Sequence, residues 1–497
     1  MKTATHFIFL FLSIGLFLSC ETAPTGDFIE NQPPNTYLTV DEINREGDFR
    51  LSSQIRISWW GTDSDGYIVG YEYAINDTSE NAWSFTTTTD STFILPITEG
   101  NEEDDVLFKI RAVDNDGAID KSGAELIFPI VNSNPTVELN LTELPPDTLF
   151  SIASFGWTID DPDGFGNIQK TEVAINDVAN GWTEIPITED ENRLFISLEI
   201  DNSTEGEKSA KVYQGRSFST LPNVTLNGLR VGETNTFYVR TVDNAGATSN
   251  IDSTSWFIKQ QTSRVLFFND FRAGNSSEKQ AQHLSYLAEL GINPDIWIIN
   301  DGDINQGQAP FSSAFPAVKD PTLTNTLARW DHIYWLSSDL RRNISFAQEI
   351  LGDFFDEGGS LFAHIPITGV TQEHPVFDLI PVDSIANGNF LILNDKPVPA
   401  DTVELNSNLD MEVDVSFAID YAQPLKAISG AKSLYTADFD RRTSRGVRAY
   451  DGYEDIAIEN SEGNLIYFSL DVEDIMGNNN VIEVLTELLV NRLNFKQ

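Results

Sequence analysis

The chain has 497 residues, of which 31 are Lys or Arg and 76 are Asp or Glu, which gives a formal net charge of −45. Its 40% hydrophobic and 11% aromatic content excludes a chain that is disordered throughout, and the length corresponds to about three domains. The acidity argues against a nucleic-acid partner, because the phosphate backbone is bound by clustered Lys and Arg.

The first residues have the pattern of a secretory signal peptide. Lys2 precedes the apolar run from Phe7 to Leu18, which is about a dozen residues long and so shorter than the roughly 20 that a membrane-spanning helix needs. The run ends in Ser19-Cys20, and Cys20 is the only cysteine. This stretch resembles a bacterial lipobox, which implies that residues 1–19 are removed and that Cys20 is acylated and becomes the first residue.

The resemblance to a lipobox sets the expected location. Residues 20–30 have no periodicity, and we expect them to form a tether between the lipid and the folded part. The protein is then a lipoprotein of the bacterial cell envelope, with the outer membrane favoured and the soluble part in the periplasm or on the cell surface. With no second cysteine, intramolecular disulfides are excluded.

Residues 31–260 contain two copies of one sequence pattern. Each copy has, in the same order, a Trp before an acidic turn, an Ala-Ile-Asn-Asp motif, a second Trp and an Arg-x-Val-Asp motif. These landmarks begin at Trp60, Ala74, Trp83 and Arg111 in the first copy, and at Trp157, Ala174, Trp182 and Arg240 in the second. The spacing between copies grows along the pattern, which predicts about 30 extra residues near 189–223.

Alternating apolar residues predict that each copy is an all-β sandwich. Ile55, Ile57 and Trp59 have the period of two that places one face of a strand inward, and Asp-Gly and Asn-Asp turn signals separate the short strands. The pattern is similar to fibronectin type III and related immunoglobulin-like modules of secreted bacterial proteins, which implies a spacer or adhesive role. We assign module 1 to residues 31–131 and module 2 to residues 132–260.

The acidic turns of the two copies are candidate calcium sites. Calcium prefers six to eight oxygen ligands, and each turn places two or three carboxylates close together. The alternative, which we favour, is that Asp begins the turn through a side-chain hydrogen bond and Gly supplies the positive φ. The candidate ligands are Asp63, Asp65, Asp114, Asp116, Asp160, Asp161 and Asp163.

From residue 261 the pattern changes to alternating strands and helices. Continuous apolar runs at 265–269, 296–300, 333–336, 361–364 and 465–469 are typical of strands buried on both faces of a parallel sheet. Helices are expected at 276–290, 344–357 and 480–493, with Ser277 and Gln280 as a capping box and Gly291 ending the first. We therefore expect residues 261–497 to form a three-layer α/β domain, with a β-rich insertion at 366–464.

Two segments of this domain resemble the glutamine-amidotransferase-like superfamily, whose fold is flavodoxin-like. They are the helix that ends in Gly358-Gly359 before a strand, within residues 354–362, and the segment His374-Pro375-Val376-Phe377. Catalytic members place a Cys nucleophile after a strand and pair it with a His. This domain contains no Cys, so the resemblance implies a pseudoenzyme without the amidotransferase reaction.

The carboxyl ends of the parallel strands are the expected place for a ligand. The candidate catalytic residues there are His364, Asp270 and Asp339, with Asn269, Asn300, Asp301, Asp303, Ser338 and Asp471 nearby. A His among carboxylates is suited to general acid–base catalysis or to a divalent metal. The alternative is that the Asp and Asn residues cap helices and that His364 is structural. The other histidines, His283, His332 and His374, carry little signal.

These observations favour a non-catalytic binding or scaffolding role, with a glycan, a peptide or an envelope protein as partner. Trp59 and Trp60 are neighbours on one predicted strand and cannot both face inward, so one is expected to be exposed, and an exposed Trp suits sugar stacking or an interface. One alternative is a hydrolase that uses His364 and carboxylates, and another is a passive spacer. The surroundings of His364 distinguish the binding role from the hydrolase.

Overall fold

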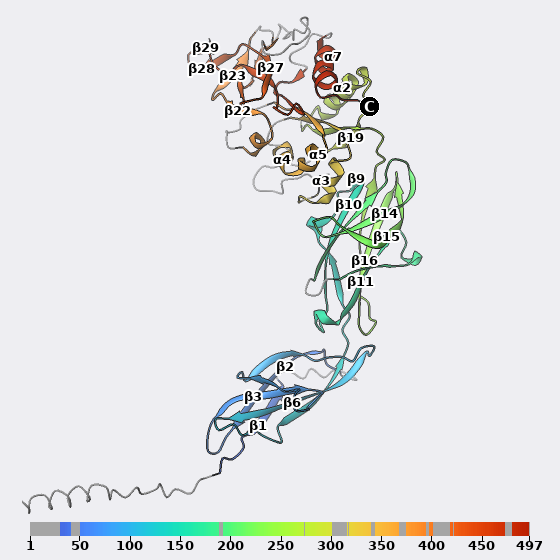
Figure 1. The fold of residues 1–497 in the computed structure, drawn as a ribbon, viewed down its shortest axis with the longest axis vertical. Helices are drawn as coiled ribbons and strands as arrows, with labels where there is room; N and C mark the ends of the chain where they lie inside the picture. Colours follow the sequence, from blue (N-terminus) through green and yellow to red (C-terminus); the bar gives the residue numbers. More distant parts are fainter. Residues whose placement is uncertain are drawn as a thin grey trace, which may run out of the picture. The chain divides into compact units, whose positions relative to one another are not determined.

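The computed structural model describes residues 30–40, 50–187, 192–272, 274–300, 316, 318–338, 343–366, 374–393, 397–400, 418–420, 422–472 and 480–496. The chain divides into two compact units, Met1–Ser133 and Asn134–Gln497, and each is described by itself (Figure 1). The boundary between the two units lies close to the expected boundary between modules 1 and 2. Module 2 and the C-terminal domain, by contrast, belong to a single unit.

Module 1 consists of two antiparallel sheets. The first has the order β1 (Asn35–Val40), β2 (Gln54–Thr62), β5 (Asp90–Ile94), and the second has the order β4 (Ser84–Thr86), β3 (Ile68–Ile75), β6 (Glu103–Asp114), β7 (Ala124–Val131). Ile57 and Trp59 of the first sheet and Phe108 and Ile110 of the second are buried in one core. The predicted inward face of Ile55, Ile57 and Trp59 and the β-sandwich of module 1 are confirmed.

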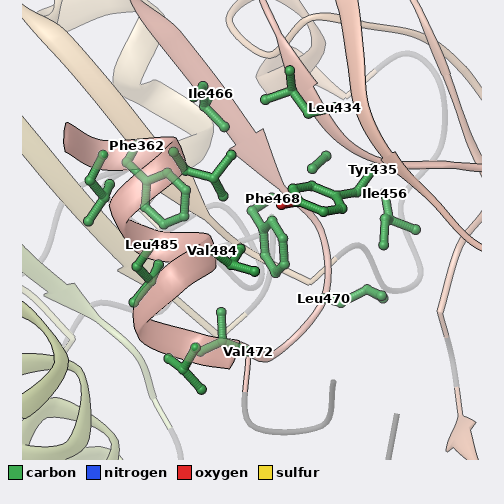
Figure 2. Packing of buried hydrophobic residues seen from close by; sticks show 14 of the residues in the cluster. Phe362, Leu434, Tyr435, Ile456, Ile466, Phe468, Leu470, Val472, Val484 and Leu485 are labelled. Carbon is green, nitrogen blue, oxygen red and sulfur yellow. The ribbon is translucent and has the colours of Figure 1, made fainter. Parts of the chain in front are cut away.

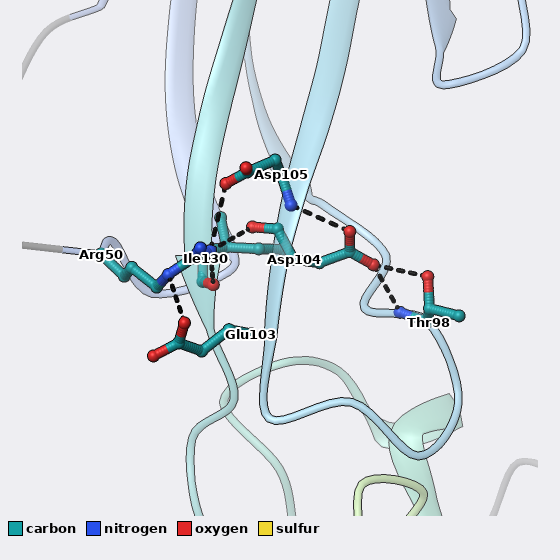
Figure 3. A network of polar contacts seen from close by, with 6 residues as sticks. All are labelled: Arg50, Thr98, Glu103, Asp104, Asp105 and Ile130. Atoms are coloured by element: carbon teal, nitrogen blue, oxygen red, sulfur yellow. Dashed lines mark hydrogen bonds and ion pairs between the residues drawn. The ribbon is translucent and has the colours of Figure 1, made fainter.

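A basic residue joins the strand ends at one edge of module 1 (Figure 3). The Arg50 Nη1 donates to the backbone oxygens of Asp104, at 2.7 Å, and of Ile130, at 3.1 Å, and its Nε lies 2.8 Å from Glu103. The carboxylate of Asp104 accepts in turn from the backbone N–H of Thr98 at 2.9 Å. These charge-assisted bonds hold the start of β6 against the end of β7.

Module 2 repeats this sandwich with additional strands. One sheet has the order β15 (Ser219–Val231), β14 (Gly206–Gln214), β13 (Arg193–Ile200), β10 (Ile152–Asp160), β8 (Thr136–Leu139). The other has the order β12 (Thr183–Ile185), β11 (Ile168–Ile175), β16 (Thr234–Asp243), β17 (Asp252–Ile258), β9 (Thr148–Leu149). β14 and β15 lie at the edge of the first sheet and have no counterpart in module 1, and the insertion expected near 189–223 overlaps them.

Strand pairing corrects the alignment of the two copies by one residue. Leu38 of β1 pairs with Trp59, and Leu139 of β8 pairs with Trp157, and both tryptophans are buried. Trp157 is therefore the counterpart of Trp59, whereas sequence matching had paired it with Trp60. The counterpart of Trp60 in module 2 is Thr158.

The duplication extends to a side-chain triad that includes the second Trp of each copy. In module 1, Arg111 lies over the ring of Trp83, 3.8 Å from its centroid, and forms an ion pair of 2.8 Å with Glu72. In module 2, Arg240, Trp182 and Glu172 repeat the arrangement, at 4.3 Å and 2.7 Å. In both copies the Glu and Arg are opposite one another on paired strands.

The C-terminal domain is built on five parallel strands. Their order is β19 (Asp295–Ile298), β18 (Val265–Asp270), β20 (His332–Ser337), β21 (Ser360–His364), β31 (Leu465–Phe468). The sheet continues through the antiparallel strands β30 (Asp455–Glu459), β26 (Leu425–Ala427) and β22 (Val382–Ile385). β30 also pairs with β27 (Lys432–Thr436), which pairs with β24 (Val398–Pro399).

Both faces of this sheet are covered, as the continuous apolar runs predict. Val265 and Phe267 belong to one core and Leu266 and Phe268 to the other. Helices α2 (Ser276–Glu289) and α7 (Asn480–Leu485) contribute to the first core, and α3 (Pro321–Leu327), α4 (Ala347–Ile350) and α5 (Gly352–Asp356) to the second. Figure 2 shows part of the first core, where Phe362 and Phe468 pack near α7.

Several local expectations for this domain need correction. The single helix expected at 344–357 is divided into the 3₁₀ segment η4 (Asn343–Phe346), α4 and α5. Ser277 makes no capping box with Gln280, because Gln280 instead accepts a hydrogen bond of 2.7 Å from the side chain of Asn269. The last helix continues beyond α7 as the π-helical segment η6 (Thr486–Arg492).

The expected β character of residues 366–464 is confirmed for the described part of that segment. Besides β22, β24, β26, β27 and β30, it holds a separate antiparallel sheet. The order of that sheet is β25 (Ile419–Asp420), β23 (Asn389–Ile392), β28 (Asp440–Thr443), β29 (Gly446–Ala449). Among the helices of the described ranges, none is long and apolar enough to cross a membrane.

Module 2 and the C-terminal domain share a core. Phe150 of module 2 is fully buried among residues of the C-terminal domain, with its ring 4.8 Å from that of Trp330 and 5.6 Å from that of Trp297. Beside it, the backbone N–H of Ser154 donates to the hydroxyl of Thr322 on α3 at 2.9 Å. This shared packing explains why the two form one compact unit.

Candidate functional site

His364, the strongest catalytic candidate, lies at the end of β21 and is only 2% exposed. Its ring stacks on Phe468 at 5.6 Å, and its Nε2 accepts from the backbone N–H of Val472 at 3.3 Å. That bond places the proton of the neutral ring on Nδ1, which has no hydrogen-bond partner among the described residues. Burial lowers the pKa of His364 to about 4, so the ring is neutral at physiological pH.

Asp270 is equally inaccessible. It is fully buried at the end of β18, where its carboxylate accepts from the side chain of Asn343 at 2.8 Å and from the backbone N–H of Ile344 at 3.2 Å. It therefore holds the start of the η4 segment. Asp339, Asp301 and Asp303 lie outside the described residues. Because His364 and Asp270 are buried and bonded to their own fold, the geometry argues against a hydrolase that uses them.

Sequence reasoning missed a polar cluster beneath the end of the sheet. His283 and Lys279 of α2 are buried, and the ring of His283 lies 5.1 Å from that of His364. His283 Nδ1 lies 2.8 Å from the Tyr334 hydroxyl, and Lys279 forms an ion pair of 2.7 Å with Asp471. The available signal was the spacing of four between Lys279, His283 and Leu287, which places them on one helix face.

We expect the buried His364 to make the protein less stable in acid. The unfolded His has a pKa of about 6.5, above the folded value of about 4, so between these values only the unfolded chain takes up the proton. The free energy of unfolding therefore falls as the pH drops from 6.5 to 4, by about 3 kcal/mol for the whole interval. Urea unfolding at pH 7 and pH 5 measures the difference.

The matched variant is His364→Asn, which keeps an acceptor for Val472 and does not titrate. Burial raises the pKa of Asp320 to about 6 and so opposes the effect of His364, which makes the comparison of variant with wild type necessary. The variant is expected to lose less stability than wild type between the two pH values. Equal losses in both proteins would show that His364 is not the titrating group.

In each module the two acidic loops lie at the same end. In module 1, the backbone N–H of Tyr67 donates to the side chain of Asn115 at 2.8 Å, and in module 2, the backbone N–H of Asn244 donates to the carbonyl of Asn167 at 2.8 Å. The carboxylate of Asp161 is buried, and burial together with the nearby Asp163 and Asp243 raises its pKa to about 6. Within each module, therefore, the two acidic loops lie next to one another.

Asp114 and Asp161 nevertheless form hydrogen bonds within their own loops. Asp114 accepts from the backbone N–H groups of Asp116, at 2.9 Å, and of Ala118, at 2.8 Å, and Asp161 accepts from that of Asp163 at 2.7 Å. Within the described ranges, no group of three or more His, Cys, Asp or Glu side chains is placed to hold a metal ion. The geometry thus favours the turn alternative over calcium at Asp63, Asp65, Asp114, Asp116, Asp160, Asp161 and Asp163.

Module 1 exposes an aromatic pair on its three-stranded sheet. Trp59 is buried and Trp60 is 47% exposed, as expected from their adjacent positions. Tyr37, which is 44% exposed, is paired with Trp60 across β1 and β2, and the two rings stack at 5.4 Å with an interplanar angle of 15°. The sandwich does not require this pair, because module 2 has Glu138 and Thr158 at the corresponding paired positions.

Polar side chains flank the aromatic pair on the same sheet face. Thr39 and Ser58 are the next paired positions along β1 and β2, and Ser58 pairs in turn with Asp90 of β5. Asp90 forms an ion pair of 2.7 Å with Arg56. The result is an open surface with an aromatic centre and a rim of hydroxyl and charged groups. We call Tyr37, Trp60 and this rim the aromatic platform.

Comparison with known proteins yields weak structural likeness alone. No protein-family model matches the chain, and no curated protein matches it. The fibronectin(III)-like modules of Clostridium thermocellum CbhA are 18% identical, with a TM-score of 0.16, over 45% of this chain and 95% of that one. The PKD1 domain of the Vibrio cholerae metalloprotease PrtV is 15% identical, with a TM-score of 0.15, over 20% and 99%.

Carbohydrate-binding modules of the β-sandwich superfamily are also similar, at 12% identity and a TM-score of 0.17, over 46% of this chain and 86% of that one. These neighbours are fibronectin-like and other β-sandwich proteins. Likeness of this degree says nothing about function, and the sandwich architecture rests on the strand pairing described above.

Proposed function

We propose that this protein is a non-catalytic carbohydrate-binding lipoprotein of the bacterial cell envelope. The observation that carries the proposal is the exposed Tyr37–Trp60 pair, which the fold does not need. The burial of His364 and Asp270 supports the non-catalytic part of the proposal, because neither side chain can reach a substrate.

The chemistry of the aromatic platform suits a sugar. The C–H groups of a pyranose face pack on indole and phenol rings, while its hydroxyls exchange hydrogen bonds with hydroxyl, amide and carboxylate groups. The rim supplies such groups at Thr39, Ser58 and Asp90. A protein partner, by contrast, favours a broader patch whose buried centre is apolar.

The lipid anchor is also part of the proposal. The apolar run from Phe7 to Leu18 and the single Cys20 support acylation at Cys20, with the soluble part outside the cytoplasm and the outer membrane favoured. The C-terminal domain is proposed to be an amidotransferase-like, flavodoxin-like pseudoenzyme. The parallel order β19-β18-β20-β21-β31 and the absence of any cysteine after Cys20 support this assignment.

The variant Trp60→Thr tests the proposal without disturbing the sandwich, because Thr is the residue that module 2 has at this position. Calorimetric titration of residues 20–497 uses cello-, chito-, xylo-, malto- and mannohexaose as probes. We expect at least one hexaose to bind and Trp60→Thr to weaken its binding to the aromatic platform about tenfold or more, which corresponds to about 1.4 kcal/mol of lost stacking.

The control is Ile127→Thr, which removes an exposed apolar side chain from β7 in the other sheet of module 1. Its affinity for the hexaose should equal that of the wild type. Unchanged binding by Trp60→Thr would contradict a role for the aromatic platform.

A further inference from the structure

Module 2 contains a polar cleft of about 490 Å³ that module 1 is not built to form. One wall is the segment that follows β11, with Asp177, Asn180 and Trp182. The opposite wall consists of Glu207 of β14 and Asn227 of β15. Since β14 and β15 are the strands that module 2 has gained, the insertion supplies one whole side of the cleft.

The aromatic group of this cleft is fixed in place. Arg240 covers the Trp182 ring at 4.3 Å, and Glu172 holds Arg240 through an ion pair of 2.7 Å. Glu172 is also 2.6 Å from Lys170, so its carboxylate is bound from two sides. Trp182 itself is half-buried, which leaves part of its indole available to line the cleft. A ligand would therefore meet a preorganised aromatic surface.

Several polar groups of the cleft are not used by the fold. Within the described residues, the side chains of Asn180 and Glu207 are exposed and have no hydrogen-bond or ion-pair partner, and the Asp177 carboxylate caps a 3₁₀ turn through Oδ1 alone. An amide both donates and accepts, and a carboxylate accepts. The cleft is lined by two carboxylates, those of Asp177 and Glu207, and by one cation, Arg230. This excess of negative charge disfavours an anionic ligand.

We infer that this cleft is a second carbohydrate site, which takes one or two neutral sugar units against Trp182. An aromatic ring beside amide and carboxylate groups matches the alternating C–H faces and hydroxyls of a sugar, and the cleft has the volume of a small-molecule site. The inference rests on the proposed function, because it names a further site for the same class of ligand. The two modules then differ in the shape of their binding surface, because module 1 exposes an open platform and module 2 a cleft.

The chain supplies a matched pair of variants for the test. Trp182→Ala removes the aromatic group of the cleft, and Trp83→Ala removes the equivalent Trp–Arg contact in module 1, where the wall is missing. The double variant Asn180→Ala/Glu207→Ala changes two exposed side chains and leaves the core intact. Calorimetry on residues 20–497 with the hexaose that binds wild type measures the number of sites, and circular dichroism checks folding.

The expected result is two bound hexaoses per wild-type chain and one per chain in Trp182→Ala and in the double variant. Trp83→Ala should keep two, and Trp60→Thr should keep one, bound in the cleft. If Trp182→Ala and the double variant bind as the wild type does, the cleft is not a site, while the platform proposal stands. If wild type binds none of the five hexaoses, both proposals fail.

Discussion

Replacing Cys20 with Ser is expected to abolish incorporation of a labelled fatty acid into the protein. Cys20 carries the only thiol of the chain, and a serine hydroxyl is far less nucleophilic than a thiolate. Since each buried methylene contributes about 0.8 kcal/mol to membrane affinity, two or more acyl chains hold a protein stably on a bilayer. The measurement is metabolic labelling with palmitate, followed by mass spectrometry of the amino terminus.

The control for this result is Ser19→Ala, which changes the neighbouring residue and leaves the thiol. It should remain acylated, with a mature chain that begins at Cys20. An unacylated amino terminus in the wild type, or a Cys20→Ser protein that is still labelled, would contradict the lipid anchor.

Truncation of Phe150 is expected to cause a large loss of stability in the unit formed by module 2 and the C-terminal domain. The ring is fully buried against Trp297 and Trp330, so Phe150→Ala leaves a cavity in the shared core. Such truncations cost about 3–5 kcal/mol. Urea unfolding followed by tryptophan fluorescence measures the cost, and a single transition is expected to separate into two as the shared core is weakened.

Leu141→Ala is the matched control, because Leu141 is an apolar residue of the same module that is 85% exposed. We expect its unfolding free energy to stay within about 0.5 kcal/mol of wild type. A Phe150→Ala protein that loses less than about 1 kcal/mol would mean that the two domains do not stabilise each other through this contact.

Periodicity explains which parts of the fold could be predicted from the sequence. A period of two at Ile55, Ile57 and Trp59 fixes an inward face, and it also requires the adjacent Trp60 to face outward. Apolar runs without alternation predicted strands with both faces covered, as found for β18. The extra residues of module 2 were expected from the spacing of the repeat alone. That β14 and β15 form a wall of the cleft could be recognised only in the structure.

Other features depend on contacts between residues that are distant in the sequence. The burial of His283 and Lys279 follows from packing against His364 and Asp471. The expected capping box failed because Gln280 bonds to Asn269 in the neighbouring strand instead. The repeat alignment placed Trp157 against Trp60, since two adjacent tryptophans match equally well until strand pairing decides between them.

The fate of a bound oligosaccharide tests the central claim most directly. Residues 20–497 are incubated with the hexaose that they bind, and the ligand is recovered and sized by chromatography. The account predicts that the hexaose is recovered at its original length, because His364 and Asp270 are buried in the fold. Recovery of shorter sugars, with cleavage lost in His364→Asn or Asp270→Asn, would show that the C-terminal domain is a hydrolase.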